Sequence, residues 1–277
     1  MSHRKNISLV LALAVLTMTV GLSPAFAAIT GEVLDGASTN TDAWVTAESA
    51  GNYQIDYQPS SGDYSVGPNG QTSTVSASKY GDEREVQTGI SSSQSNVDFD
   101  IGSRTTIHVN YVLSVDGSIS ESAMRSHIQS AEDYFQEEHN INFIESSSPT
   151  WGSETDTTYS DLRDNVETDV DWDNITGDIL IAFLDDDDMT CSGVAATGCT
   201  TVESSGGNRP TILVASDSSD FPRTIMHELS HNYGMSHDTA LCASLVPGIM
   251  GTSCGSNYIM NWRPTHDTDM ENRRTWY

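Results

Sequence analysis

The sequence predicts two regions of different class, a small all-β unit followed by a larger α/β domain. Residues 28–102 contain short runs such as "TGEVL", "AWVTAES" and "VDFDI", which alternate apolar and polar residues and are separated by Gly, Ser, Asn and Asp. From about residue 103 longer apolar runs, "GDILIAFL" and "PTILVA", alternate with segments of helical periodicity. The first pattern predicts a β-sandwich, and the second predicts a mostly parallel sheet covered by helices.

The first 27 residues predict a secretory signal peptide rather than part of either region. Arg4 and Lys5 precede an apolar run over residues 7–22, and Ala25 and Ala27 supply the small residues that favour cleavage after Ala27. A membrane anchor is the alternative, but the run is short for a full span and no stop-transfer pattern follows it. We therefore expect a secreted, extracellular chain with no membrane partner once residues 1–27 are removed.

The α/β region, residues 103–277, begins with a predicted strand over residues 105–113 and then a helix, for which Ser120 is a candidate N-cap. The helix is predicted by apolar residues that share one face, namely Met124, Ile128, Ala131 and Phe135. "INFIES" and residues 177–184 and 210–215 predict further strands. A last helix is predicted over residues 223–233, with caps in residues 217–220 and Pro222 in its first turn.

The charge of the chain is extremely acidic. It has 39 acidic against 12 basic residues, a net charge of −27, and its two lysines are Lys5 and Lys79. Such a surface repels nucleic acid and anionic lipid, so neither is expected as a partner. Because salt screens self-repulsion, and because this composition resembles that of proteins from salt-loving microbes, we expect a halophilic protein. An acidic secreted protein without salt dependence is the alternative.

The four cysteines, Cys191, Cys199, Cys242 and Cys254, are expected to form disulfides in an exported chain. Sequential pairing, 191–199 and 242–254, closes two short loops and is our prediction, although the sequence alone allows three pairings. A zinc cluster is the competing interpretation, but no CxxC spacing supports it.

The segment "TIMHELSHNYGMSHDT", residues 224–239, carries the strongest chemical signal. On a helix, His227 and His231 share one face, so both rings can reach one ion at the zinc–nitrogen bond length of about 2.0–2.1 Å. Glu228 is offset by about 100° and lies beside the ion, where it can exchange a proton with bound water. Gly234 ends the helix and turns the chain, which lets His237 approach the same point.

Three histidines leave a fourth position of a tetrahedral zinc site open, which is typical of catalytic rather than structural zinc. A chance match to the six specified positions, which include Asp238, is expected on the order of 10⁻⁸ per starting position. A structural zinc site would leave Glu228 without a role. The pattern therefore favours a catalytic zinc held by His227, His231 and His237.

The pattern HExxHxxGxxHD is similar to the extended signature of the metzincin metallopeptidases, most closely their adamalysin/reprolysin branch. The resemblance covers about residues 103–277 and implies a twisted, mostly parallel sheet of about five strands with an antiparallel edge strand, placed near Cys191–Cys199. It also implies a methionine turn, for which Met250 is preferred and Met260 is the rival. Ser230 stands where the family usually has glycine.

The activity implied is that of a secreted zinc-dependent endopeptidase whose extended polypeptide substrate pairs with the edge strand. Zinc would polarise the scissile carbonyl and lower the pKa of water towards ~7, while Glu228 acts as general base and then general acid. Asp238 is expected to support the site without binding the metal. Two alternatives remain, a zinc hydrolase of non-peptide substrates and a surface-binding protein with a vestigial metal site.

Residues 28–102 resemble the carboxypeptidase-regulatory-like, transthyretin-like domains, which implies an accessory module; a removable prosegment is the alternative. No cysteine precedes Cys191, so a prodomain cysteine that silences the zinc is absent. Residues 185–188, "DDDD", could bind Ca²⁺, but they fit no EF-hand pattern and a solvated acidic loop is the simpler interpretation.

Overall fold

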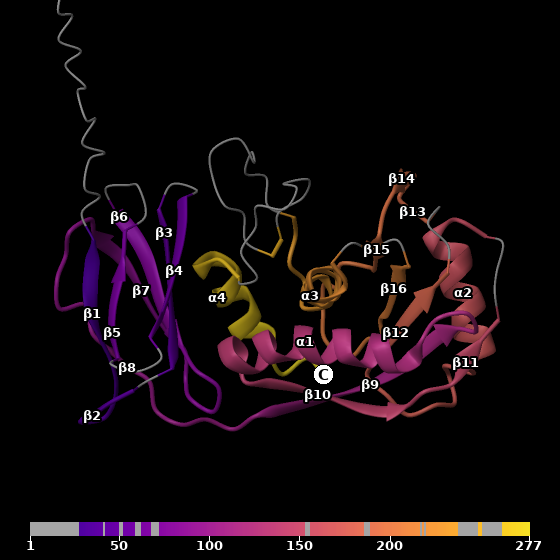
Figure 1. Cartoon of the computed structure of the whole chain (residues 1–277), viewed down its shortest axis with the longest axis horizontal. Coiled ribbons are helices and arrows are strands. Elements are labelled where there is room, and N and C mark those ends of the chain that lie inside the picture. The colour runs from indigo at the N-terminus through magenta and orange to yellow at the C-terminus, as the bar shows by residue number, and fades with distance from the viewer. Residues whose placement is uncertain are drawn as a thin grey trace, which may run out of the picture.

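The computed structural model describes residues 28–40, 42–49, 52–58, 62–67, 72–152, 156–185, 189–216, 218, 220–237, 249–250 and 262–277. Figure 1 shows an N-terminal group of strands beside a larger α/β part, with helix α4 between the strands and helix α3. The predicted signal peptide, residues 1–27, lies outside the described residues. Among the helices that the structure describes, none has the length and hydropathy to cross a membrane.

The N-terminal unit contains two small sheets. One has the order β2-β1-β5, with β8 paired in parallel to β1, and the other has the antiparallel order β4-β3-β6-β7. Their strands are β1 (Ile29–Asp35), β2 (Ser38–Thr39), β3 (Ala43–Ser49), β4 (Asn52–Gln58), β5 (Asp63–Val66), β6 (Thr72–Ser78), β7 (Glu85–Ser91) and β8 (Phe99–Asp100). Alternate residues of both sheets, among them Val33, Val45 and Phe99, form one buried apolar cluster, as the alternating pattern predicts.

The α/β part is built on a mostly parallel sheet of order β10-β9-β12-β16-β15, in which only β15 is antiparallel; β11 pairs in parallel with the end of β9, beyond β10. Its strands are β9 (Ile107–Asp116), β10 (Ile141–Ser147), β11 (Thr150–Trp151), β12 (Ile179–Leu184), β15 (Gly198–Cys199) and β16 (Thr211–Ala215). Strands β12 and β16 are buried along their whole length, as near-continuous apolar runs require. The predicted mostly parallel sheet with an antiparallel edge is confirmed.

The predicted antiparallel edge near Cys191–Cys199 is confined to residues 198–199. Residues 190–195 instead form a separate hairpin, β13 (Thr190–Cys191) with β14 (Val194–Ala195). The disulfide between Cys191 and Cys199 joins this hairpin to the sheet edge and confirms the first predicted pairing, while Cys242 and Cys254 lie outside the described residues.

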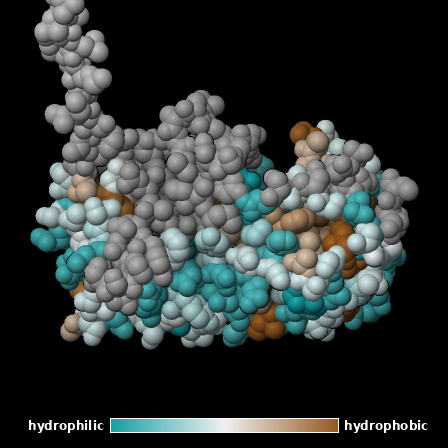
Figure 2. Space-filling view, in the orientation of Figure 1, coloured by the Kyte–Doolittle hydropathy of each residue, from teal (hydrophilic) through white to brown (hydrophobic). Residues whose placement is uncertain are grey.

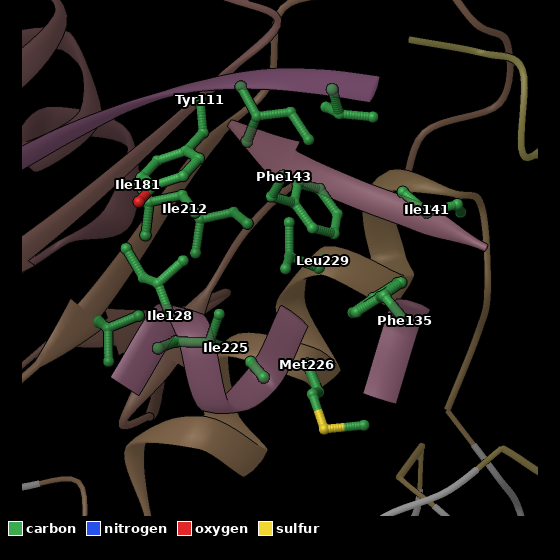
Figure 3. Packing of buried hydrophobic residues seen from close by; sticks show 14 of the residues in the cluster. Tyr111, Ile128, Phe135, Ile141, Phe143, Ile181, Ile212, Ile225, Met226 and Leu229 are labelled. Carbon is green, nitrogen blue, oxygen red and sulfur yellow. The ribbon is translucent and has the colours of Figure 1, made fainter. Parts of the chain in front are cut away.

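Helices α1 (Glu121–His139) and α3 (Phe221–Asn232) cover one face of the sheet. The predicted face of α1 is buried, with Ile128 and Phe135 packing among strand residues such as Phe143 and Ile181 and against Ile225 of α3 (Figure 3). The predicted N-cap of α1 is only half right, because Ser120 precedes the helix but its side chain makes no capping hydrogen bond.

Two helices are not anticipated by the sequence patterns. Helix α2 (Tyr159–Asp169) buries only Leu162 and Val166, in a core on the other face of the sheet. Helix α4 (Pro264–Arg273) is largely polar, and it contacts strands β3 and β6 of the N-terminal unit. The sequences of α2 and α4 lack the sustained apolar periodicity that identifies α1. Each of these two helices packs through few apolar residues, so the pattern is too short to predict a helix.

Charged side chains lie buried where α4 and α1 meet the N-terminal unit. The guanidinium of Arg84 pairs with the carboxylate of Asp267 and lies 3.6 Å from Glu138 Oε2, and these three side chains are at most 1% exposed. Arg263 pairs with Glu48 of β3 across the same contact. The two units therefore share an interface in which buried charges of opposite sign are paired.

Candidate metal and catalytic site

Helix α3 carries the motif and begins at Phe221, slightly before the predicted start at residue 223, with its cap inside the predicted residues 217–220. The side chain of Asp220 accepts a hydrogen bond from the Arg223 amide at 3.3 Å, and Pro222 lies in the first turn. The helix is buried from Thr224 to Asn232, which explains the apolar Ile225, Met226 and Leu229 beside its histidines. His227 and His231 are thereby held on a helix that cannot rotate without exposing its core face.

The three predicted histidines meet at one point. The Nε2 atoms of His227 and His231 are 3.2 Å apart, those of His231 and His237 are 3.1 Å apart, and those of His237 and His227 are 3.0 Å apart. Four tetrahedral ligands with bonds of about 2.0–2.1 Å to zinc would lie about 3.3 Å from one another. The spacing of the rings therefore fits the zinc ion that the motif implies.

The tautomers of two rings are set by backbone carbonyls. His227 Nδ1 donates to the Ile249 carbonyl at 2.9 Å, and His231 Nδ1 donates to the Met235 carbonyl at 2.6 Å. Because a carbonyl can only accept, each Nδ1 carries the hydrogen and the neutral ring presents an Nε2 lone pair to the common point. Lone pairs that face one another at this point repel, and a cation between them removes that repulsion.

Burial keeps these rings neutral. Burial, with a smaller contribution from the neighbouring histidines, lowers the pKa of His227 to about 3 and that of His231 to about 4. His237 is exposed and lines the cleft, and its partial desolvation also lowers its pKa. All three histidines are therefore in the form that binds metal at neutral pH.

The turn after α3 requires Gly234 for two reasons. Its φ is +75°, in the region that favours glycine, and a Cβ there would lie 2.7 Å from Arg273 Nη1 and 2.8 Å from the Glu203 carbonyl oxygen. The amide of Gly234 donates to the His231 carbonyl at 2.8 Å, which closes the helix. The predicted glycine bend is confirmed, and it delivers His237 to the other two rings.

Glu228 lies beside the three rings and lines the same cleft. Its side chain is buried between α3 and the edge strand β15, with 6% of the residue exposed. Burial raises the pKa of Glu228 to about 8, against a smaller opposing effect of the Arg223 charge. A carboxyl group in this position can hold or release a proton near neutral pH.

Met250, the preferred candidate for the methionine turn, is fully buried in the same core cluster as Met226. Its neighbour Ile249 supplies the carbonyl that orients His227. Ser230, which departs from the family pattern, bonds the Met226 carbonyl at 2.7 Å and accepts from Trp262 Nε1 at 2.8 Å. The hydroxyl thus satisfies an indole that a glycine would leave without this acceptor.

A cleft of about 860 Å³ runs over the site. One wall is α3 with Glu228 and the histidines, and the other is the β13–β14 hairpin with strand β15. Val194 at the hairpin is 69% exposed, and Figure 2 shows hydrophobic surface at the tip of this hairpin, which stands clear of the rest of the molecule. The cleft is large enough to accept several residues of a peptide.

A second group of potential ligands was not found by sequence reasoning. Glu138, His139 and Asp267 are buried together at the interface between the two units. Arg84 already supplies a cation to this cluster, since it pairs with Asp267 and lies close to Glu138. We therefore interpret the group as part of the buried ion network and not as a metal site.

Several predicted features fall outside the described residues, namely Asp238, Met260 and Asp186–Asp188 of the acidic run. Asp185 is described and accepts a hydrogen bond from Ser118 Oγ. Calcium binding by this run therefore stays a prediction, as does the supporting role of Asp238.

A protein-family model agrees with the site. A reprolysin model, described as metallo-peptidase family M12, matches residues 105–273. Among solved structures, the chain is similar to archaemetzincin from Methanopyrus kandleri, with 14% identity, a TM-score of 0.42, and coverage of 60% of this chain and 96% of the other. No curated protein matches the chain.

Proposed function

Because the chain belongs to metallopeptidase family M12, a family of zinc endopeptidases, we propose that its cleft hydrolyses internal bonds of extended polypeptides with Glu228 as the proton-transfer group. His227, His231 and His237 would hold the zinc. The observation that carries the proposal is the convergence of three Nε2 atoms, 3.0–3.2 Å apart, beside a buried carboxyl group.

Zinc, when bound, supplies a Lewis acid that polarises the scissile carbonyl and makes water more acidic. The protein residues do the rest. The carbonyls of Ile249 and Met235 hold His227 and His231 in the tautomer that presents Nε2. The Glu228 carboxylate takes a proton from the attacking water and returns it to the leaving amine, and its raised pKa favours retention of the proton between these transfers.

The edge strand β15 supports an extended substrate. It is the last strand of the sheet order and is antiparallel to β16, so its outer side can pair with a peptide as an additional strand. The cleft lies along this edge and contains Glu228 and the three histidines. A peptide bound there would pass directly over the site.

The proposal includes retention of residues 28–102 as a module of the carboxypeptidase-regulatory-like type. Its support is the buried interface, since Arg84 of this module pairs with Asp267 and lies near Glu138 in the α/β part. Removal of the module would take this cation away from both carboxylates and would expose the surface of α1 and α4 that β3 and β6 cover. A prosegment that must leave would not be expected to place its arginine among buried carboxylates of the domain it leaves.

We also propose that the protein is secreted and works in concentrated salt. The support is compositional: a net charge of −27, two lysines and an N-terminal segment of signal type. Unfolding midpoints measured from low to molar salt test the second part. Stability that is greatest in dilute buffer would contradict it.

The central experiment compares the wild-type protein with Glu228→Gln, using zinc content and casein hydrolysis with and without a chelator. We expect equal zinc and a loss of activity of about 10²–10⁴-fold in the variant. Glu83→Gln, an exposed position in the N-terminal unit, is the matched control and should keep full activity.

Full casein hydrolysis by Glu228→Gln would refute the role of this residue. Zinc binding with hydrolysis of model esters but not of casein would favour the alternative of a non-peptide hydrolase. A folded protein that binds no divalent metal would favour a surface-binding protein with a vestigial site.

A further inference from the structure

Gly198 occupies the edge strand β15 at the point where that strand passes Glu228. It is paired with Val214 of β16, and the neighbouring Ala215 amide donates to the Thr197 carbonyl at 2.9 Å. In an antiparallel ladder this pattern makes Gly198 and Val214 a non-hydrogen-bonded pair. The N–H and C=O of Gly198 therefore point away from β16, towards the open edge of the sheet.

The side-chain direction of Gly198 points at the catalytic helix. A Cβ built on this residue would lie 2.5 Å from Thr224 Cγ2, 2.8 Å from Glu228 Oε1 and 3.0 Å from Glu228 Cγ. Its φ is not in the positive region, so the backbone conformation itself would accept alanine. What excludes a side chain at this position is the proximity of Thr224 and Glu228.

Neither wall of this contact can retreat easily. The next residue, Cys199, is buried, pairs with Leu213 of β16, and is joined by a disulfide to Cys191 of the β13–β14 hairpin, so β15 is held from both sides. On the other side, Ile225 and Leu229 of α3 are buried in the main core cluster and hold the helix in place. A methyl group at position 198 would therefore have to displace the Glu228 side chain or separate the strand from the helix.

We propose that Gly198 is a positioning residue: its missing side chain sets the separation between the peptide-pairing edge and the Glu228 carboxylate. The main-chain groups of Gly198 face the open edge, where a substrate can pair with them. The missing side chain of Gly198 leaves space for the Glu228 carboxyl group on the other side. The inference rests on the proposed function, since it gives Glu228 its role in proton transfer. It adds that the space left by the missing side chain of Gly198 determines where the Glu228 carboxyl group lies in the cleft.

The first test is Gly198→Ala in the full-length, zinc-loaded enzyme. We expect unchanged zinc content, a kcat about 10–100-fold lower because the base is displaced, and a KM within about threefold of wild type. The matched control is Gly117→Ala, which adds the same methyl group where no atom lies within 4 Å and should keep wild-type kinetics. An additional Thr224→Ser removes the closest methyl group, keeps the hydroxyl that contacts Ser218, and should recover part of kcat.

The second test measures stability and does not depend on activity. A double-mutant cycle compares the effect of Gly198→Ala on the thermal midpoint in the wild-type and in the Glu228→Ala background. If the new methyl group strikes Glu228, the loss of midpoint must be smaller once that side chain is gone. If Gly198→Ala alone does not fold, the same comparison is made in the Thr224→Ser background.

The outcomes separate this inference from the proposed function. If Glu228→Gln is inactive while Gly198→Ala keeps wild-type kcat, only the positioning role is overturned. If Gly198→Ala lowers the midpoint equally in both backgrounds, its contact with Glu228 is not what matters, and the inference also fails. If Glu228→Gln is fully active, the proposed function itself fails.

Discussion

Replacing Arg84 with methionine should destabilise the folded chain by about 3–5 kcal/mol, the usual cost of removing one partner from a buried ion pair. Methionine preserves much of the length and apolar volume of the side chain but removes its charge. The Arg84 and Asp267 side chains are at most 1% exposed, and Glu138 lies 3.6 Å from the guanidinium. The two carboxylates would stay buried without this cation.

The magnitude follows from burial, since water cannot replace the lost partner. Arg84 also donates to Ser76 Oγ at 2.6 Å, so the substitution removes a charge-assisted hydrogen bond as well. His139 Nε2 lies 3.5 Å from Asp267 Oδ1 and can relieve only part of the loss, because burial lowers the pKa of His139 to about 4 and keeps it neutral.

The assay is urea-induced unfolding followed by tryptophan fluorescence, with the free energy obtained by linear extrapolation. The matched control is Arg163→Met, because Arg163 pairs with Asp164 in a partly exposed position where an ion pair contributes about 0–1 kcal/mol. The deficit of the Arg84 variant should persist in molar salt, since salt screens exposed charges and has little effect on buried ones.

A cost below about 1 kcal/mol for Arg84→Met, equal to that of the Arg163 control, would refute the argument. It would show that the N-terminal unit is not fixed to the α/β part by buried charge. The proposal that residues 28–102 are retained would then lose its main support.

Three further predictions concern the site and its surroundings. Because burial raises the pKa of Glu228 to about 8 from an ordinary 4.5, its contribution to the stability of the metal-free protein is present below about pH 4.5 and is lost as the pH rises through about 8. Glu228→Gln should therefore flatten the pH dependence of the unfolding free energy between those values in chelator, and parallel profiles would contradict this. Replacing both Cys191 and Cys199 with serine should cost about 2.5 kcal/mol by the loop-entropy relation for a separation of 8 residues, measured by urea unfolding, and no change would show that the hairpin is held without the bond. Ser230→Ala should cost about 1–3 kcal/mol, because it removes the acceptor 2.8 Å from Trp262 Nε1, and an unchanged unfolding midpoint would show that this hydrogen bond is dispensable.

The sequence by itself determined the local part of the site. The four-residue spacing of His227 and His231, the adjacent Glu228 and the bend at Gly234 are set by the period of one helix and by the backbone freedom of one residue. The apolar face of α1 and the buried strands follow from the same short-range periodicities. These features need no knowledge of where the rest of the chain lies, and the structure has them as predicted.

Only the tertiary structure decided what surrounds the motif. The Ile249 carbonyl reaches His227 from 22 residues away, Gly198 meets Glu228 across a strand and a helix, and Arg84 neutralises Asp267 from the other unit. No pattern of neighbours in the sequence encodes such contacts, because they depend on how separate elements pack against one another. The sequence of one helix and one turn thus determines which groups form the site. The tautomers and the charge pairing around them depend on residues that only folding brings together.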